Sequence, residues 1–152
     1  MTYTVIPNQK EEFVFLACTG DMTLDEMTTA CRKVQLVLAE LGWKRILVDV
    51  TALQTGPDPA ELFDLAKLFW REFPQVGRIA LVVRWDQSRL AKLLETLVRS
   101  VGTCLTVFVS EEMAEAWILE NSKEPQRPAS DSLPKTAAQS DLSKVSLLCH
   151  VL

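Results

Sequence analysis

The side chains that most often carry catalysis are sparse in this 152-residue sequence. Its single histidine is His150, near the end of the sequence and outside any predicted element. A nucleophile–histidine–acid triad needs its imidazole held beside a nucleophile, which this position does not offer. The sequence also contains neither a G-x-G-x-x-G fingerprint nor a Walker P-loop. We therefore predict a protein that is not an enzyme and that uses no cofactor.

The four cysteines lie far apart and form no C-x-x-C pair, so a zinc site is not expected. Cys18 and Cys104 lie in apolar, strand-like runs, and Cys31 lies on the apolar face of a predicted helix. We expect buried, reduced thiols that pack as small apolar side chains.

Asp49 stands at the carboxyl end of a predicted central strand, where open α/β sheets place their ligands. Its carboxylate is either a polar contact in a binding site or an acceptor for the backbone that follows. Thr51 and Thr55 lie in a loop predicted over residues 51–57. The Thr55 hydroxyl is either a phosphorylation site or an ordinary loop hydroxyl.

Three aromatic residues exceed what the predicted core needs, namely Phe63, Trp70 and Trp85. The helix that contains the first two already has an apolar stripe, which consists of Leu62, Leu65, Ala66, Phe69 and Phe73. Phe63 and Trp70 are seven residues apart and form a second apolar line beside it. They either pack against a neighbouring helix or line an apolar groove or partner surface.

Three cationic residues, Arg84, Arg89 and Lys92, lie close to Trp85 in the sequence. They are either the solvated face of a helix or the anchors for an anionic headgroup or carboxylate, if they converge with Trp85.

The elements that must position these residues alternate along the chain. Short apolar runs bounded by turn residues predict five strands over Tyr3–Ile6, Phe13–Cys18, Arg45–Val50, Arg78–Val83 and Leu105–Val109. Capping residues and apolar spacing predict four helices. Their predicted caps are Thr23, Asp58, either Asp86 or Ser88, and Ser110.

The order β-β-α-β-α-β-α-β-α implies parallel strands joined by right-handed crossovers. The last three strands are apolar at nearly every position, as strands buried on both faces require. The first strand is more polar and is stopped by Pro7, so we expect it as an antiparallel edge beside the second. The predicted fold class is α/β, with a mixed five-stranded sheet and helices packed against it.

Composition divides the chain into a domain over residues 1–120, a disordered Pro/Ser-rich linker over 121–141 and a short apolar segment over 142–152. The last four residues, from Cys149, match the loose prenylation pattern with a terminal leucine, but no polybasic stretch precedes them. The alternative is that 142–152 docks on an apolar surface.

Charge and hydropathy narrow the choice of partners. A net charge of −4 makes nucleic acid a poor partner, because phosphate contacts dominate that affinity. The sequence begins without a signal peptide, and no apolar run reaches the roughly 18–20 residues that span a bilayer. We expect a cytoplasmic protein with no transmembrane segment, in which peripheral membrane contact stays open.

The chain resembles the SpoIIAA-like domain family, a STAS-type family found mainly in bacteria. The resemblance is spread from Phe13 to Leu119. It is carried by the strand ending in Gly20 with Met22–Glu26, by Ile46–Asp49 with Thr51, by Arg78–Val82 with Trp85, and by Val107–Phe108 with Ala114–Trp117. The resemblance implies the fold described above and a non-enzymatic module for regulation, protein docking or ligand sensing.

Two properties of such relatives bear on the site residues. In anti-sigma-factor antagonists, the loop after the central strand carries an Asp-Ser pair whose serine is phosphorylated by a partner kinase. The corresponding segment here, Thr51–Asp58, lacks that pair, and Thr55 is its nearest hydroxyl. Other relatives bind lipids, and some open an apolar cleft between helices.

Two functions are therefore expected. The first is a regulatory module that docks a protein partner through the surface around Thr51–Trp70. The alternative is a domain for a small apolar ligand or lipid, with a groove between the second and third helices. In that alternative the three surplus aromatics form the walls and the three cationic residues form the anchors. Either function is compatible with a homodimer.

Overall fold

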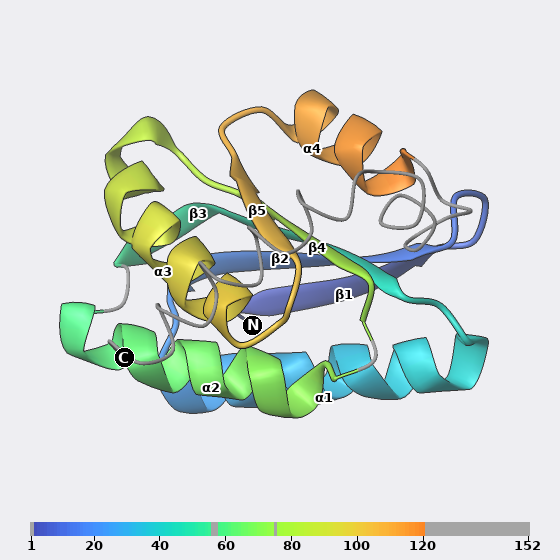
Figure 1. Cartoon of the computed structure of the whole chain (residues 1–152), viewed down its shortest axis with the longest axis horizontal. Coiled ribbons are helices and arrows are strands. Elements are labelled where there is room, and N and C mark those ends of the chain that lie inside the picture. The colour runs from blue at the N-terminus through green and yellow to red at the C-terminus, as the bar shows by residue number, and fades with distance from the viewer. Residues whose placement is uncertain (1, 56–57, 75, 121–152) are drawn as a thin grey trace, which may run out of the picture.

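The computed structural model describes residues 2–55, 58–74 and 76–120, so the predicted linker and the apolar segment 142–152 lie outside the described residues. Five strands and four helices follow one another in the described ranges (Figure 1). Their bounds are β1 Tyr3–Asn8, β2 Phe13–Asp21, α1 Leu24–Leu41, β3 Arg45–Thr55, α2 Leu62–Glu72, β4 Arg78–Val82, α3 Ser88–Ser100, β5 Leu105–Phe108 and α4 Glu111–Leu119. Two 3₁₀ turns, Pro59–Glu61 and Trp85–Gln87, lead into α2 and α3.

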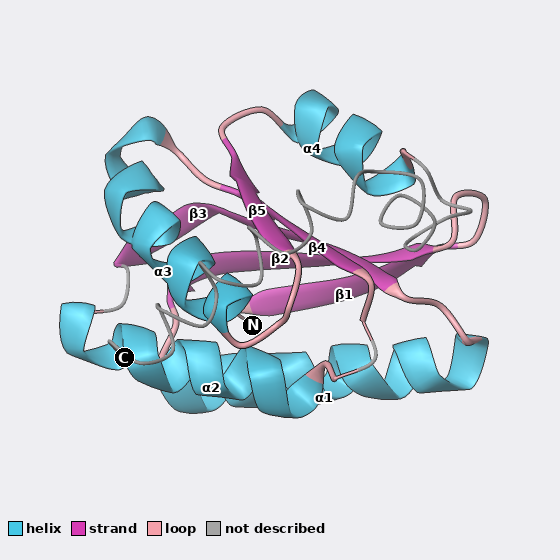
Figure 2. Ribbon diagram, viewed as in Figure 1, coloured by secondary structure: helices cyan, strands magenta, loops and turns pink. Residues whose placement is uncertain are grey.

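The strands form one sheet in the order β1-β2-β3-β4-β5 (Figure 2). β1 pairs antiparallel with β2, and the other neighbours pair in parallel. This arrangement confirms the predicted mixed sheet with an antiparallel first edge. None of the helices in the described part of the chain combines the length and apolarity of a membrane-spanning segment.

The two faces of the sheet are covered unequally. Helices α1, α2 and α3 lie on one face and α4 lies on the other (Figure 1). Since successive strand side chains point to opposite faces, Ile46 and Val48 of β3 join the core of the three-helix face, while Leu47 joins the core under α4. All three are buried, which explains why this strand is apolar at consecutive positions.

Local signals in the sequence set the bounds of α1 as predicted. The Thr23 amide donates to Glu26 Oε1 at 2.9 Å, and the Glu26 amide donates to Thr23 Oγ1 at 3.1 Å. At the other end, Gly42 adopts the left-handed conformation with φ of 73° and donates its amide to the carbonyl of Leu38 at 2.7 Å. Both capping arrangements satisfy backbone groups that the helix leaves unpaired at its ends.

The predicted loop over residues 51–57 was wrong for its first five residues. Thr51–Thr55 continue β3, because β2 also continues beyond Cys18 as far as Asp21 and pairs with them. The register between these strands shifts twice, between Ala17 and Thr19 and again between Gly20 and Asp21. The β3 side carries the extra residue each time, so its end is bulged and locally twisted.

The prediction that Pro7 stops the first strand was also wrong, since β1 extends through Pro7 to Asn8. Proline has no amide hydrogen and is tolerated on an edge strand, where one side of the strand has no partner. The opposite edge, β5, is covered by a side chain of α3. Arg99 Nε donates to the Leu105 carbonyl at 2.8 Å.

Candidate functional site

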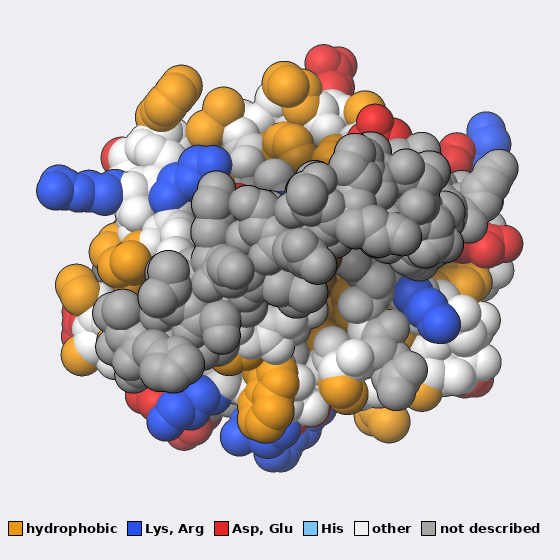
Figure 3. Space-filling model, in the orientation of Figure 1, with side chains coloured by type: hydrophobic (Ala, Val, Ile, Leu, Met, Phe, Trp, Pro, Cys, Tyr) orange, Lys and Arg blue, Asp and Glu red, His pale blue; other side chains and the backbone are white. Residues whose placement is uncertain are grey.

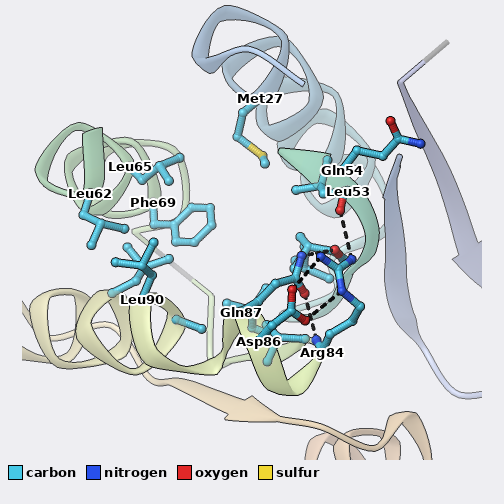
Figure 4. Close-up of a pocket in the computed structure, with 16 residues that line it drawn as sticks. Met27, Leu53, Gln54, Leu62, Leu65, Phe69, Arg84, Asp86, Gln87 and Leu90 are labelled. Atoms are coloured by element: carbon cyan, nitrogen blue, oxygen red, sulfur yellow. Dashed lines mark hydrogen bonds and ion pairs between the residues drawn. The ribbon is translucent and has the colours of Figure 1, made fainter. Parts of the chain in front are cut away.

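A cavity of about 260 Å³ lies between α2 and α3, above the β3 and β4 strands. Figure 4 shows Leu65 and Phe69 of α2, Leu90 of α3 and Met27 of α1 around it. Most of the remaining lining consists of aliphatic side chains of β3, of β4 and the residue after it, and of α3, namely Val48, Val50, Leu53, Leu81, Val83, Ala91 and Leu94. The structure therefore contains an apolar space where the sequence predicted a groove.

The mouth of this cavity is polar. Gln54 of β3 and Arg84, Asp86 and Gln87 of the turn before α3 lie at its rim (Figure 4). Arg84 Nε and Nη2 donate to the two carboxylate oxygens of Asp86 at 2.9 and 3.3 Å. This pairing with the Arg84 guanidinium holds the pKa of Asp86 below its usual range.

Arg84 and Gln87 also hold the end of β3 in place. The β3–β4 ladder ends at the pair Asp49 and Val82, so later β3 carbonyls have no partner amide on β4. Arg84 Nη1 donates to the carbonyls of Thr51 and Leu53, the latter at 2.9 Å. Gln87 Nε2 donates to the carbonyl of Val50 at 2.9 Å. Side chains thus replace the missing strand pairing.

Asp49 supports the bulge in β3. Its Oδ1 accepts from the Thr51 amide at 2.9 Å and from the Thr51 hydroxyl at 2.6 Å. Of the two interpretations of Asp49 given above, the structure therefore shows the second, in which the carboxylate accepts from the backbone that follows it. Asp49 and Thr51 are both half-buried, and the carboxylate compensates for ladder bonds disrupted by the bulge.

Thr55 lies at the exposed end of β3 and not in a loop. Its hydroxyl donates to Asp21 Oδ1 at 3.0 Å, which ties the ends of β3 and β2 together. Thr55 and Glu61 also line a small surface hollow of about 30 Å³, next to the start of α2. The hydroxyl is therefore at the surface, between the sheet and α2.

The three surplus aromatics lie at the surface. Phe63, Trp70 and Trp85 are 50%, 56% and 78% exposed, and none of them lines the cavity. Phe63, Lys67 and Trp70 are exposed at helical spacing on the side of α2 that faces away from the core, and we call them the α2 stripe. On the face seen in Figure 3, apolar side chains reach the surface in several separate places.

The cationic residues have different environments. Arg84 lines the cavity, whereas Arg89 and Lys92 do not. Lys92 Nζ forms an ion pair with Glu95 Oε1 at 3.4 Å on the surface of α3. Arg89 is exposed in the first turn of the same helix. The structure thus brings one of the three predicted anchors to the apolar space.

The cysteines of the described ranges are free thiols, and Cys18 and Cys31 are buried as predicted. Burial, with a smaller contribution from Asp49, raises the pKa of Cys18 to about 12. Burial also raises the pKa of Cys31. Cys104 differs from the prediction, because it lies just before β5 and is half-buried. Cys149 and His150 lie outside the described residues.

Sequence reasoning assigned most of the cavity lining to the core and overlooked two of its polar residues, Asp86 and Gln87, as site residues. An apolar stripe on a helix has the same spacing whether it faces another side chain or a void. The signal that was available was the position of these polar residues directly after β4, at the carboxyl edge of a parallel sheet.

Comparisons with known proteins agree with this architecture. An uncharacterised protein from Shewanella loihica PV-4 with a SpoIIAA-like fold aligns with a TM-score of 0.55 and 16% identity, over 76% of this chain and 91% of that chain. An anti-sigma factor antagonist from Mycobacterium paratuberculosis aligns with a TM-score of 0.54 and 12% identity, over 77% of this chain and 92% of that chain. At these identities the likeness establishes the fold.

No curated protein sequence matches the chain. The sequence model of the SpoIIAA-like family, however, matches residues 13–119, which include every described element from β2 to α4. The chain therefore belongs to the SpoIIAA-like family.

Proposed function

We propose that this domain is a non-enzymatic regulatory module that docks a protein partner through the α2 stripe. The observation that carries the proposal is the exposure of Phe63 and Trp70, on a helix whose opposite face is buried in the core. Aromatic side chains bury about 150–250 Å² each and dominate the energetics of many interfaces. Tryptophan is also enriched among the residues that carry most of the binding energy.

The charges around the α2 stripe specify the partner further. Lys67 lies between the two aromatics at one helical turn from each, and all three side chains are exposed. A complementary partner surface would offer an apolar pocket for Trp70 and a carboxylate opposite Lys67. The fold is shared with a protein described as an anti-sigma factor antagonist, which supports a protein rather than a nucleic acid as the partner.

Thr55 is the residue we propose as a phosphorylation switch for this surface. Thr55 is exposed, whereas Thr51 is half-buried. A phosphate on Thr55 adds between about −1.5 and −2 charges at neutral pH. It would stand against the Asp21 carboxylate that the hydroxyl now contacts. Repulsion there would loosen the end of β3 next to the start of α2.

The docking proposal is tested by affinity capture with the unmodified protein and with Trp70→Ala and Phe63→Ala variants. We expect both variants to lose the partner that the unmodified protein retains. Leu36→Ala is the matched control, because Leu36 is 70% exposed on α1 and is outside the α2 stripe. Circular dichroism checks that all proteins are folded. Identical partners for all four proteins would refute the proposal.

A second candidate function rests on the cavity between α2 and α3, which suits a small apolar ligand or part of a lipid chain. Its volume of about 260 Å³ exceeds the roughly 150 Å³ of engineered apolar cavities that bind benzene. It is slightly below the roughly 300–1,000 Å³ of typical ligand pockets, which favours a short apolar group. Gln54 at the mouth would bind a polar end of the ligand.

Native mass spectrometry of the purified protein, followed by thermal unfolding with added fatty acids and phospholipids, tests this second function. A bound acyl compound or a rise in melting temperature is expected, and Ala91→Leu should abolish either effect by filling the cavity. A mass spectrum that shows only the protein, together with no change in melting temperature, would refute this second function. Co-sedimentation with anionic vesicles tests the remaining expectation of peripheral membrane contact through exposed Trp85.

A further inference from the structure

On the face of the sheet that carries α4, β1 and β2 have no helix over them in the described part of the chain. Helix α4 packs against β3, β4 and β5. A helix is about 10 Å wide and strands are about 4.8 Å apart, so one helix cannot cover all five strands. On this face Ile6 of β1 is 49% exposed and Phe15 of β2 is half-buried. These apolar side chains lie beside α4 without a covering layer.

The uncovered strands and α4 form an open groove of about 520 Å³, which we call the α4 groove. Its apolar lining includes Ile6, Phe13, Phe15 and Leu47. Two acidic residues of α4, Glu111 and Glu115, one helical turn apart, form its wall. The rest of the lining comes from the end of β1 and the turn after it, which contributes one cation, Lys10. The α4 groove is thus apolar along its base and negatively charged along α4.

We propose that residues 142–152 of the same chain dock into the α4 groove. The described chain ends at Glu120, directly after α4. Ile118 in the last turn of α4 packs in the same buried cluster as Phe13, which lines the groove. The 21 residues from 121 to 141 have a root-mean-square reach of about 25 Å if they behave as a flexible chain. The linker therefore starts near the groove, and it is long enough for the segment 142–152 to reach it.

The chemistry of the segment fits this surface. Residues 142–152 contain six large aliphatic side chains, namely Leu142, Val145, Leu147, Leu148, Val151 and Leu152. They contain one lysine, Lys144, and no acidic side chain. Lys144 matches the acidic wall formed by Glu111 and Glu115. The α2 stripe is a poorer fit, since its one charged member is Lys67 and it offers no carboxylate to Lys144.

Intramolecular docking requires little intrinsic affinity. A tethered segment has an effective concentration on the order of millimolar near its site. Burial of aliphatic side chains, at about 25 cal/mol per Å², offsets part of the entropy that is lost when the segment is ordered. A second protein that offers a stronger apolar segment would compete for the same groove, so the docked segment would regulate access to it.

The experiment uses the full-length chain with a nitroxide spin label on Cys149. The change Cys104→Ser removes the half-buried thiol, and Cys18 and Cys31 are protected by burial. In NMR spectra, we expect the backbone amide signals of Ile6 and Phe15 to lose most of their intensity, relative to spectra of the same protein after the label has been reduced. The amide of Leu36 on α1, which lies on the opposite side of the sheet, should keep its intensity.

A matched pair of charge reversals tests the acidic wall. Glu111→Lys should restore much of the lost intensity, whereas Glu112→Lys should leave the broadening unchanged. Both residues lie in the first turn of α4, so they interact similarly with its helix dipole, but only Glu111 lines the groove. Leu148→Asp in the segment should also restore the intensity, and circular dichroism checks that each variant is folded.

Three outcomes would overturn the proposal. The first is an absence of broadening at all described residues. The second is broadening confined to another surface, such as the α2 stripe. The third is broadening that appears only when labelled and unlabelled chains are mixed, which would mean that the segment docks on a second copy.

Discussion

Arg84 donates a hydrogen bond from its guanidinium to the carbonyl of Leu53 at 2.9 Å, across the mouth of the cavity. Leu53 lies near the end of β3 and Arg84 follows β4, beyond the point where the two strands stop pairing through their backbones. The same guanidinium contacts the carbonyl of Thr51 and both oxygens of Asp86. Most of its donors are therefore engaged within the protein, which makes Arg84 a support for the mouth and a weaker anchor for an anionic ligand.

Replacing Arg84 by alanine should destabilise the domain. The change leaves the part-buried carbonyls of Thr51 and Leu53 without a donor, and each such loss costs roughly 1–3 kcal/mol. Because both carbonyls are only part-buried and can regain water, urea unfolding should show a total decrease in the free energy of unfolding of about 1–3 kcal/mol. Arg89→Ala is the control, since Arg89 is exposed and should change the free energy by less than about 0.5 kcal/mol. Equal effects of the two changes would contradict the supporting role.

Enlarging a side chain in the cavity should be tolerated better than enlarging one in the packed core. Ala91 lines the cavity, so Ala91→Leu places its added atoms in empty space and should lower the free energy of unfolding by less than about 1 kcal/mol. Ala30 is fully buried on α1 and does not line the cavity, so Ala30→Leu should lower it by about 1–3 kcal/mol. Urea unfolding of both variants measures these two free-energy changes. If Ala91→Leu lowered the free energy of unfolding more than Ala30→Leu does, there would be no empty space beside residue 91.

Stability should depend on the ionisation of Glu26 in acid. Hydrogen bonding from the Thr23 amide lowers the pKa of Glu26. Its ionised form therefore stabilises the fold at pH values above its unfolded pKa of about 4.3, and this contribution is lost as the pH falls through the lower folded value. The free energy of unfolding of Glu26→Gln should thus lie below that of the unmodified protein at pH 6 and approach it at pH 3.

A second glutamate on α1 provides a control of opposite sign. Glu40 lies in the last turn, where a negative charge opposes the helix dipole. Glu40→Gln removes this charge and should raise the free energy of unfolding slightly. A Glu26→Gln difference that does not change with pH would contradict the role of the carboxylate in capping.

The buried thiols should be inert in the native state. Since burial raises the pKa of Cys18 to about 12 and raises that of Cys31 as well, neither forms an appreciable amount of thiolate at pH 8. Iodoacetamide at pH 8 should modify the half-buried Cys104 before either of them. Peptide mass spectrometry identifies the sites. Modification of Cys18 in native protein at the rate seen in urea would contradict the packing described for β2.

The order of strands and helices along the chain, the antiparallel edge and the α1 caps could be predicted because each depends on short-range patterns. The Thr23–Glu26 pair lies within one turn, and the apolar strands are recognisable residue by residue. The continuation of β3 to Thr55 could not be predicted, because it depends on pairing with Gly20 and Asp21, more than thirty residues earlier. Polar composition in Thr51–Thr55 indicated a loop, and long-range pairing outweighed it.

The candidate site was predicted less completely for a related reason. The surplus of Phe63 and Trp70 was recognisable, because helical spacing alone places them away from the buried stripe. Whether two helices leave a void between them depends on the separation of α2 from α3, which no local pattern encodes. Arg84 was predicted as an anion anchor, but its partners Thr51 and Leu53 come from another strand.

Pro7 in β1 has a consequence for how copies of this chain can associate. Pro7 interrupts the row of amide donors along the outer side of the edge strand β1. At the other edge strand, β5, Arg99 donates a hydrogen bond to the outward-facing carbonyl of Leu105. Unprotected margins of this kind recruit further strands and lead to fibrils. With both margins obstructed, any homodimer should form through side-chain surfaces, and stacking into continuous cross-β assemblies is disfavoured.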